Sequence, residues 1–274
     1  MGKKILFVDI DDTLLTRSKE ITPENRKAIH EAVQAGHEVV ITTGRPLLAM
    51  TRFLDDLNLR EKGCYAITFN GAEIYDCYAD KVIYRNPVKK KAAVALYEEA
   101  VRLGYYCQFY DEDDKLVCLR LDENAQFYIN RLRIPYRVPE DFLASIPEHP
   151  IKMMLLDVNS HEHLEQFKSS HKEWAEGKFE MFYSNPAFLE CVAPGTSKGT
   201  ALRRLAEMQN VPIENTIAAG DSENDLSMIE AAGVGCAMKN ADDCVKDIAD
   251  YITENDCDNS GVAEIINRFM LNEK

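Results

Sequence analysis

The chain has 274 residues, a net charge of −14 and 46% hydrophobic residues, which is typical of a globular protein with one large or two medium domains. No apolar run reaches the roughly 18 residues of a membrane-spanning helix, so we expect no membrane partner. The acidic surplus argues against a nucleic-acid partner, because binding to phosphate backbones requires clustered basic residues. The eight cysteines include no Cys-x-x-Cys pair, which disfavours a zinc site and favours a reducing, cytoplasmic location.

The first third of the chain alternates between strands and helices. Residues 4–10 contain a continuous apolar run, which is typical of a strand buried on both faces. Thr22-Pro23 starts a helix that Gly36 ends, and Pro46 starts another. Further strands are expected at 38–42 and 64–69. This alternation predicts a parallel sheet covered by helices.

The pattern changes at Asn70-Gly71, a strong hairpin signal. Helices are expected from Asn86-Pro87 to Leu103 and over 160–174. The strands expected in this region are 72–75, 82–84, 105–110, 116–121, 151–158, 179–184 and 188–192. Paired short strands with few helices indicate an α+β segment.

From residue 197 the alternation returns. The expected helices are 197–209, 224–232, 241–249 and 261–270, and the expected strands are 216–220 and 234–238. We therefore predict an α/β protein with a Rossmann-like, three-layer parallel-sheet core formed by residues 1–82 plus 188–274. Residues 83–187 are predicted to form an inserted α+β domain. The sequence makes no prediction of the oligomeric state.

Two carboxylates follow the first predicted strand. Asp9 and Asp11 would lie beyond its carboxyl end, where open α/β sheets bind ligands. Crowded carboxylates repel one another unless a cation intervenes, which suggests a hard divalent ion such as Mg²⁺. One carboxylate could then attack phosphorus while the other transfers a proton. Taken alone, an acidic turn that caps a helix explains the pair equally well.

Polar residues also follow the second predicted strand. Thr43 could donate to a phosphate oxygen, and Gly44 would let backbone amides approach the phosphate at a helix N-terminus. A plain helix cap is the simpler explanation of this motif by itself. Lys198, at the start of another helix, is disfavoured there by the helix dipole unless an anion binds nearby. A solvated surface lysine is the alternative.

A fourth motif, Gly220-Asp221-Ser222-Glu223-Asn224-Asp225, again joins a strand to a helix. Asp221 could complete the oxygen ligands of the cation, Asp225 could be a direct or an outer ligand, and Asn224 could donate to phosphate. Each motif has a structural explanation when taken alone. Complementary metal and phosphate ligands at several strand ends of one sheet nevertheless indicate a common site.

These four segments resemble the motifs of the haloacid dehalogenase superfamily, in order and spacing. The insertion resembles the type-two (IIB-like) cap of its Cof-like hydrolases, and Asn70-Gly71-Ala72 and residues 258–263 also match. The resemblance implies that Asp9 is the nucleophile and a Mg²⁺ ligand, and that Asp11 is the acid/base and ligates through its carbonyl. It implies that Asp221 is the third metal ligand. The phosphate-binding residues it implies are Thr43, Gly44, Lys198 and Asn224.

We therefore predict a magnesium-dependent phosphatase of small phosphorylated metabolites that forms an aspartyl-phosphate. The resemblance implies sugar phosphates, nucleotides or cofactor phosphates as substrates, selected by the cap domain. A phosphomutase and a non-catalytic phosphate-binding or sensing module are the alternatives. Asp12 replaces the glycine that is usual in the first motif, and aspartate tolerates left-handed backbone better than most residues.

Overall fold

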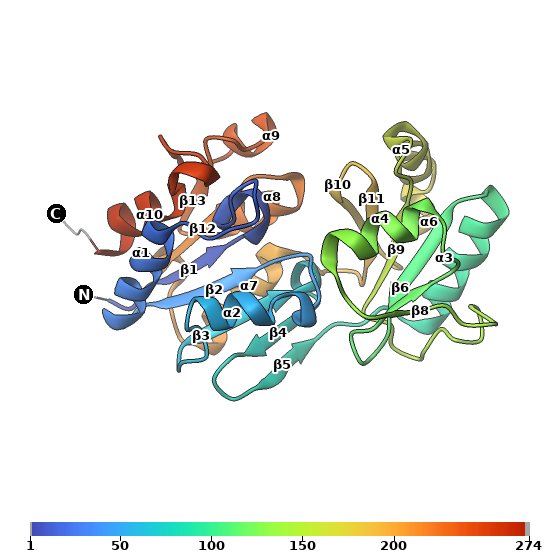
Figure 1. Ribbon diagram of the computed structural model, residues 1–274, viewed down its shortest axis with the longest axis horizontal. Coiled ribbons are helices and arrows are strands. Elements are labelled where there is room, and N and C mark those ends of the chain that lie inside the picture. Colours follow the sequence, from blue (N-terminus) through green and yellow to red (C-terminus); the bar gives the residue numbers. More distant parts are fainter. Residues whose placement is uncertain (1, 272–274) are drawn as a thin grey trace. The chain divides into compact units, whose positions relative to one another are not determined.

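The computed structural model describes residues 2–271 and divides into two compact units (Figure 1). Unit 1 comprises Met1–Gly44, Met50–Tyr84 and Ser197–Lys274. Unit 2 comprises Arg45–Ala49 and Arg85–Thr196. The second unit is therefore an insertion into the chain of the first.

Unit 1 is built on an eight-stranded sheet with β1 near its middle. Its strands, in spatial order, are β14 (Tyr251–Ile252), β13 (Val234–Ala237), β12 (Thr216–Gly220), β1 (Ile5–Val8), β2 (Glu38–Thr42), β3 (Cys64–Thr68), β4 (Glu73–Asp76) and β5 (Lys81–Arg85). The strands from β14 to β3 are parallel, and β4 runs antiparallel to β3. All residues of β1, β2, β3 and β12 are buried, which explains why their sequences are mainly apolar.

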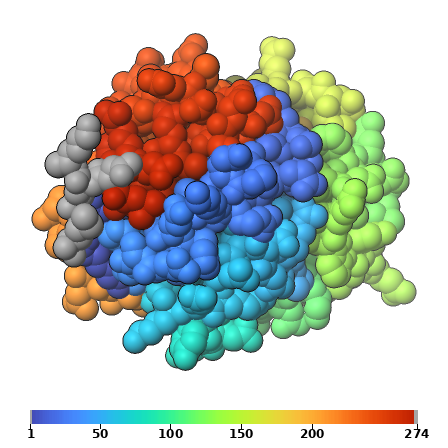
Figure 2. Space-filling model, turned by 60° about the vertical axis from the view of Figure 1, so that its left-hand side comes forward, coloured from blue at the N-terminus to red at the C-terminus, as the bar shows by residue number. Residues whose placement is uncertain are grey.

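The helices of unit 1 connect these strands. They are α1 (Pro23–Gln34), α2 (Thr51–Asp56), α7 (Lys198–Met208), α8 (Leu226–Ala231), α9 (Asp243–Lys246) and α10 (Gly261–Ile266). Helix α1 packs against α10, so the blue N-terminal and red C-terminal segments lie side by side in Figure 2. Helix α7 packs against α8. Helix α1 connects β1 to β2, and α8 connects β12 to β13 in the opposite direction along the sheet. Because such crossovers are right-handed, the two helices lie on opposite faces, in agreement with the predicted three-layer α/β core.

Unit 2 has its own sheet and hydrophobic core. Its strands, in spatial order, are β10 (Glu180–Asn185), β11 (Phe188–Val192), β9 (Lys152–Leu156), β6 (Tyr106–Tyr110), β7 (Leu116–Cys118) and β8 (Tyr136–Arg137). Its helices are α3 (Lys90–Leu103), α4 (Glu123–Leu132), α5 (His161–Ser170) and α6 (Lys172–Ala175). Apolar residues of α3 and α5 pack with the sheet in one buried cluster. The hairpin predicted over 105–121 is present as β6 and β7.

Three sequence-based expectations need correction. The predicted core includes residues 188–192, but β11 pairs with β9 and β10, and the second unit extends to Thr196. The second unit also includes Arg45–Ala49, which the prediction places in the core. Helix α4 was not expected, although Asp122 caps it by accepting hydrogen bonds from the amides of Asn124 and Ala125. Helix α3 begins at Lys90 instead of after Asn86. The amides of Val88 and Lys90 bond to carbonyls at 150 and 148, which holds the preceding residues in extended conformation.

No helix within residues 2–271 combines the length and the apolar character needed to cross a bilayer.

Candidate active site

Three strand ends deliver polar side chains to one edge of the core sheet. Asp9 follows β1, Thr43 follows β2 and Asp221 follows β12. These strands are adjacent and parallel, in the order β12-β1-β2 (Figure 1). Their carboxyl ends therefore meet at the edge where open α/β sheets bind ligands.

Carboxylates of Asp9, Asp221 and Asp225 form a buried cluster. Among the described residues, these three each offer one oxygen such that all lie within 4.8 Å of one another. Their exposures are 6%, 8% and 0%. The side chain of Asp225 points back toward the end of β12. Its Oδ2 accepts hydrogen bonds from the amides of Asp221 and Ser222 at 2.9 and 3.1 Å.

Lys198 is the buried cation of this cluster. Its Nζ lies 2.5 Å from Oδ1 of Asp9 and 2.5 Å from Oδ1 of Asp225, and its side chain is fully buried. The lysine is the first residue of α7, which Ser197 and Thr200 begin with a capping box. A Cβ at Gly199 would lie 2.0 Å from the carbonyl oxygen of Ser227, so this glycine permits the close packing of α7 on α8 that seats the lysine.

The ionisation of the cluster reflects its excess of negative charge. Burial raises the pKa of Asp9 well above its usual range; Lys198 opposes this shift, and neighbouring carboxylates add to it. Burial, followed by repulsion from Asp225, raises the pKa of Asp221 to about 7. Burial alone would lower the pKa of Lys198, but attraction to Asp225 and Asp9 outweighs it, and the net shift is upward. The lysine therefore stays charged.

The cluster has the composition of a site for a hard divalent cation. One ammonium faces three buried carboxylates, so the site lacks positive charge, and carboxylate oxygens are the ligands that Mg²⁺ prefers. Thr13 Oγ1 donates to Oδ1 of Asp221 at 2.6 Å, and Ser222 Oγ donates to its Oδ2 at 3.0 Å. These bonds orient Asp221, and each oxygen keeps further acceptor capacity for a cation.

Asp11 lies outside the carboxylate cluster. Its Oδ1 is 3.1 Å from Nζ of Lys19, and its side chain is 27% exposed. Asp12, which follows it, has left-handed backbone with φ 58° and ψ 12°. Aspartate tolerates this left-handed backbone better than most residues.

The other predicted phosphate-binding residues lie together around Asn70. The carbonyl oxygen of Thr43 accepts from the amide of Asn70 at 2.9 Å. Asn224 Nδ2 donates to Oδ1 of Asn70 at 2.9 Å. A Cβ at Gly44 would lie 2.8 Å from Nδ2 of Asn70, so Gly44 makes room for this side chain.

Asn70 is a site residue that the sequence indicated as part of a turn and of the family resemblance, without a role in the site. It is 1% exposed and has left-handed backbone with φ 57°. Its side chain bonds to Asn224, 154 residues away after β12, and its amide bonds to Thr43 after β2, so Asn70 links the two segments. Its position before Gly71 after a buried strand was the available signal, because asparagine is favoured in left-handed turns.

Comparison with known proteins identifies the family. The family model of haloacid dehalogenase-like hydrolases matches residues 6–266. A 5-amino-6-(5-phospho-D-ribitylamino)uracil phosphatase of Bacillus subtilis is 33% identical, over 98% of this chain and 96% of its own. A pyridoxal phosphate phosphatase of Escherichia coli is 30% identical, over 92% of this chain and 93% of its own.

A solved structure of a sugar phosphatase of subclass IIB in this superfamily has a TM-score of 0.82 and 26% identity. The match covers 97% of this chain and 99% of that one. The chain belongs to the haloacid dehalogenase-like hydrolase family, and the fold and relatives define it as a phosphatase with a Cof-like, IIB-type architecture.

Proposed function

We propose that this protein is a magnesium-dependent phosphatase that hydrolyses small phosphate monoesters through an aspartyl-phosphate on Asp9. The observation that carries the proposal is the buried cluster of Asp9, Asp221, Asp225 and Lys198 at the carboxyl edge of the sheet. In this cluster, Asp9 lies beside the ammonium group of Lys198, and the negative charge of the carboxylates exceeds the positive charge of the lysine. Such a site is suited to phosphoryl transfer, in which positioning and charge stabilisation dominate catalysis.

In the first step, a carboxylate oxygen of Asp9 attacks phosphorus and the bond from phosphorus to the ester oxygen breaks. Asp11 gives its proton to the departing oxygen, and the alcohol leaves. In the second step, water attacks phosphorus and gives a proton to Asp11. The bond between phosphorus and Asp9 then breaks, which releases phosphate and restores the carboxylate.

Lys198 fixes the orientation of Asp9 through its bond to Oδ1, and Asp225 in turn fixes Lys198. The cation would be held by the carboxylates of Asp9 and Asp221 and by the main-chain carbonyl of Asp11. When bound, it supplies charge that offsets the crowded anions of protein and substrate. Thr43, the amides near Gly44, Lys198 and Asn224 would hold the phosphate oxygens.

The names of the relatives support a substrate class. One is named for a phosphorylated ribityl chain on a uracil, the other for pyridoxal phosphate, and the structural neighbour for sugars. In the first two compounds, a phosphorylated primary alcohol is attached to a nitrogen heterocycle. We infer that small primary alcohol phosphates, with or without such a ring, are the substrates, and that unit 2 contains their selecting side chains.

The test is phosphate release from a panel of sugar phosphates, nucleotides, pyridoxal phosphate and flavin mononucleotide. We expect turnover with Mg²⁺, loss of turnover with EDTA, and loss with Asp9→Asn while the thermal unfolding profile is retained. Acid-quenched enzyme should carry labelled phosphate that hydroxylamine removes. Near-normal turnover by Asp9→Asn would refute the nucleophile, and isomer formation without phosphate release would identify a mutase instead.

A further inference from the structure

A tight turn follows the first motif and brings Lys19 back toward it. Leu15 and Ile21 form an antiparallel bridge that closes the turn. The amide of Thr16 donates to the carbonyl of Glu20 at 2.9 Å, and the amide of Lys19 donates to the carbonyl of Thr16 at 2.8 Å. Lys19 has left-handed backbone, with φ 64°. These bonds fix the direction in which the lysine side chain leaves the turn.

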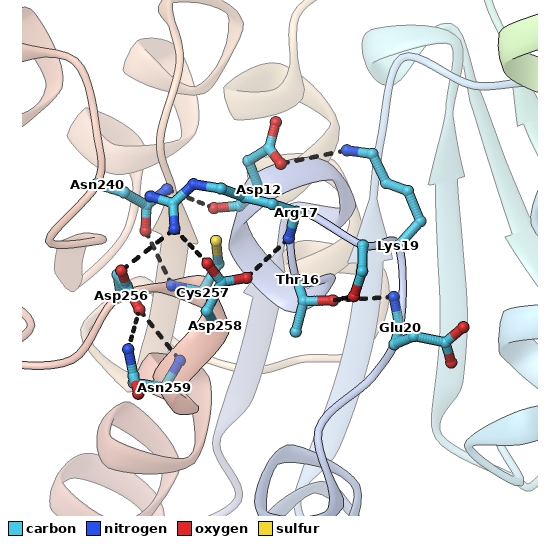
Figure 3. Close-up of polar contacts among 11 residues, drawn as sticks. Asp12, Thr16, Arg17, Lys19, Glu20, Asn240, Asp256, Cys257, Asp258 and Asn259 are labelled. Carbon is cyan, nitrogen blue, oxygen red and sulfur yellow. Dashed lines mark hydrogen bonds and ion pairs between the residues drawn. The ribbon is translucent and has the colours of Figure 1, made fainter.

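The turn is tied to a distant segment of the same unit, residues 256–259 (Figure 3). The amide of Arg17 donates to Oδ1 of Asp258 at 2.9 Å, and its guanidinium forms ion pairs with Asp256 and Asp258. Asp256 is held in turn by the amide and side chain of Asn259. Arg17, in the turn, is therefore held by hydrogen bonds and ion pairs to residues near the C-terminal end of the sequence.

Asn240 links Asp12 to residues 256–259. Its Nδ2 donates to the carbonyl oxygen of Asp12 at 2.7 Å, and its Oδ1 accepts from the amide of Cys257 at 2.9 Å (Figure 3). The left-handed backbone at Asp12 is thus held from outside the motif. The chain between Asp12 and Arg17 is therefore fixed at both ends relative to residues 256–259.

Within this frame, Nζ of Lys19 lies 3.1 Å from Oδ1 of Asp11 and 3.2 Å from Oδ1 of Asp12. We propose that Lys19 is a positioning residue that holds the Asp11 carboxyl group in the orientation required for proton transfer. This inference rests on the proposed function, which gives Asp11 the acid/base role. It assigns Lys19 a task in catalysis although the lysine is not part of any of the four motifs.

The charges around Asp11 explain why such a residue is needed. The carboxylate of Asp11 is close enough to Asp9 to raise the pKa of that group, so the two repel each other. The Asp11 side chain is 27% exposed, so the repulsion favours rotamers that face solvent. An ammonium held at a fixed distance limits this motion. The pair is too exposed to contribute much to stability, but orientation alone strongly affects the rate of proton transfer.

Substrates with different leaving groups can distinguish a role of Lys19 in proton transfer from a purely structural role. Phenyl phosphate needs a proton on its departing oxygen much more than p-nitrophenyl phosphate, whose leaving group is a stable anion. We expect Lys19→Met to lower kcat for phenyl phosphate about tenfold and kcat for p-nitrophenyl phosphate less than about threefold. KM should change little for either substrate. Lys19→Arg should restore most of the rate with phenyl phosphate, because it keeps the charge.

A double-mutant cycle tests whether Lys19 acts through Asp11. In an Asp11→Asn background, Lys19→Met should change the rate with phenyl phosphate by less than about twofold, compared with about tenfold when Asp11 is present, because the group that it positions is already inactive. Arg17→Met should slow phenyl phosphate selectively, though less than Lys19→Met, because it loosens only the anchor. Thermal unfolding of each variant confirms that it is folded.

Equal slowing of both substrates by Lys19→Met, or an undiminished effect in the Asp11→Asn background, would overturn the role of Lys19 and leave the phosphatase assignment intact. Absence of phosphate release from every monoester by the unaltered protein would overturn the proposed function itself, and the role of Lys19 with it. The two failures are therefore distinguishable.

Discussion

Lys198 is a lysine with no exposed surface, held between two carboxylates that are themselves buried. Burial of a charge is tolerated only when close partners replace the lost solvation. The same contacts that keep the lysine charged also prevent Asp9 and Asp225 from being isolated anions. Removal of this one side chain should therefore affect both chemistry and stability.

We predict that Lys198→Met lowers turnover by at least about 100-fold and the free energy of unfolding by about 3 kcal/mol at pH 8 in EDTA. Without the ammonium, the pKa of Asp9 rises further, so the folded state binds a proton that the unfolded state does not. The stability loss is therefore present at high pH and shrinks as pH falls through the folded pKa. Urea unfolding at pH 5 and pH 8 measures it, and an equal loss at both would contradict the prediction.

Asp221 provides a second test, because burial and then repulsion from Asp225 raise the pKa of its carboxyl to about 7. This value is above that of the unfolded chain, so the folded state favours the protonated form, and stability falls as pH rises from about 4 to about 7. Asp221→Asn should therefore raise the free energy of unfolding by on the order of 2 kcal/mol at pH 8 in EDTA. Below pH 4 it should have no such effect.

The same variant should lose the response to Mg²⁺. If Mg²⁺ binds the folded state as proposed, it should raise the midpoint of thermal unfolding of the unaltered protein, and removal of a ligand should weaken that binding. Asp243→Asn, on an exposed turn of α9, is the matched control and should keep the full shift. A normal Mg²⁺ shift in Asp221→Asn would exclude Asp221 as a ligand.

At the scale of single elements, the β6–β7 hairpin contains a poorly accommodated carboxylate. Asp114 has left-handed backbone with φ 59°, and its Oδ1 lacks a hydrogen bond. Arg85 lies 3.7 Å away, but burial prevails and raises the pKa of Asp114 to about 6. Ionisation of this side chain therefore opposes folding between about pH 4 and pH 6.

We predict that Asp114→Asn raises the free energy of unfolding by about 1 kcal/mol at pH 8, and that the gain disappears below pH 4. Asparagine keeps the left-handed turn and removes the buried charge. Asp113→Asn is the control, because that side chain is 74% exposed and should change stability little at either pH. Chemical denaturation of both variants at the two pH values decides the matter.

The elements also show what sequence could predict. Asp9, Thr43 and Asp221 were recognisable because each follows a fully buried strand, and parallel strands bring such positions together without any knowledge of packing. Helix α4 was missed because its centre, Phe127-Tyr128-Ile129, has weak helix propensity. Tertiary contacts stabilise it, since Ala125 and Tyr128 are buried and the Tyr128 hydroxyl bonds to that of Tyr110 at 2.9 Å.

Asn70 and Lys19 escaped prediction for a related reason. Each acts through a contact that depends on loop conformation. Asn70 contacts Asn224, and Lys19 contacts Asp11 because the turn between them is closed. Both residues have positive φ, which the Asn-Gly pair indicates for Asn70 but no local pattern indicates for Lys19. The position of functional residues at strand ends follows from the sheet topology. The position of the side chains that orient them depends on the conformation of loops.

At the scale of the whole molecule, the insertion has the features of an independent folding unit. Its buried cluster draws only on residues between Val88 and Ala193. Its chain ends are close together, because Asn86 Nδ2 donates to Thr196 Oγ1 at 2.8 Å and to the Pro194 carbonyl at 3.3 Å. A unit with its own sheet and core and adjacent ends is expected to fold without the rest of the chain.

We predict that a fragment of residues 85–196 folds cooperatively, with a free energy of unfolding on the order of 5 kcal/mol. The sequence-based boundary supplies the matched comparison. A fragment of residues 83–187 lacks β11, which lies between β10 and β9 and buries Leu189 and Cys191 in the core. Without it, β10 has no partner, so this shorter fragment should show no cooperative urea transition by circular dichroism. Equal stability of both fragments would mean that β11 is dispensable, and failure of the longer one would mean that the insertion depends on the core to fold.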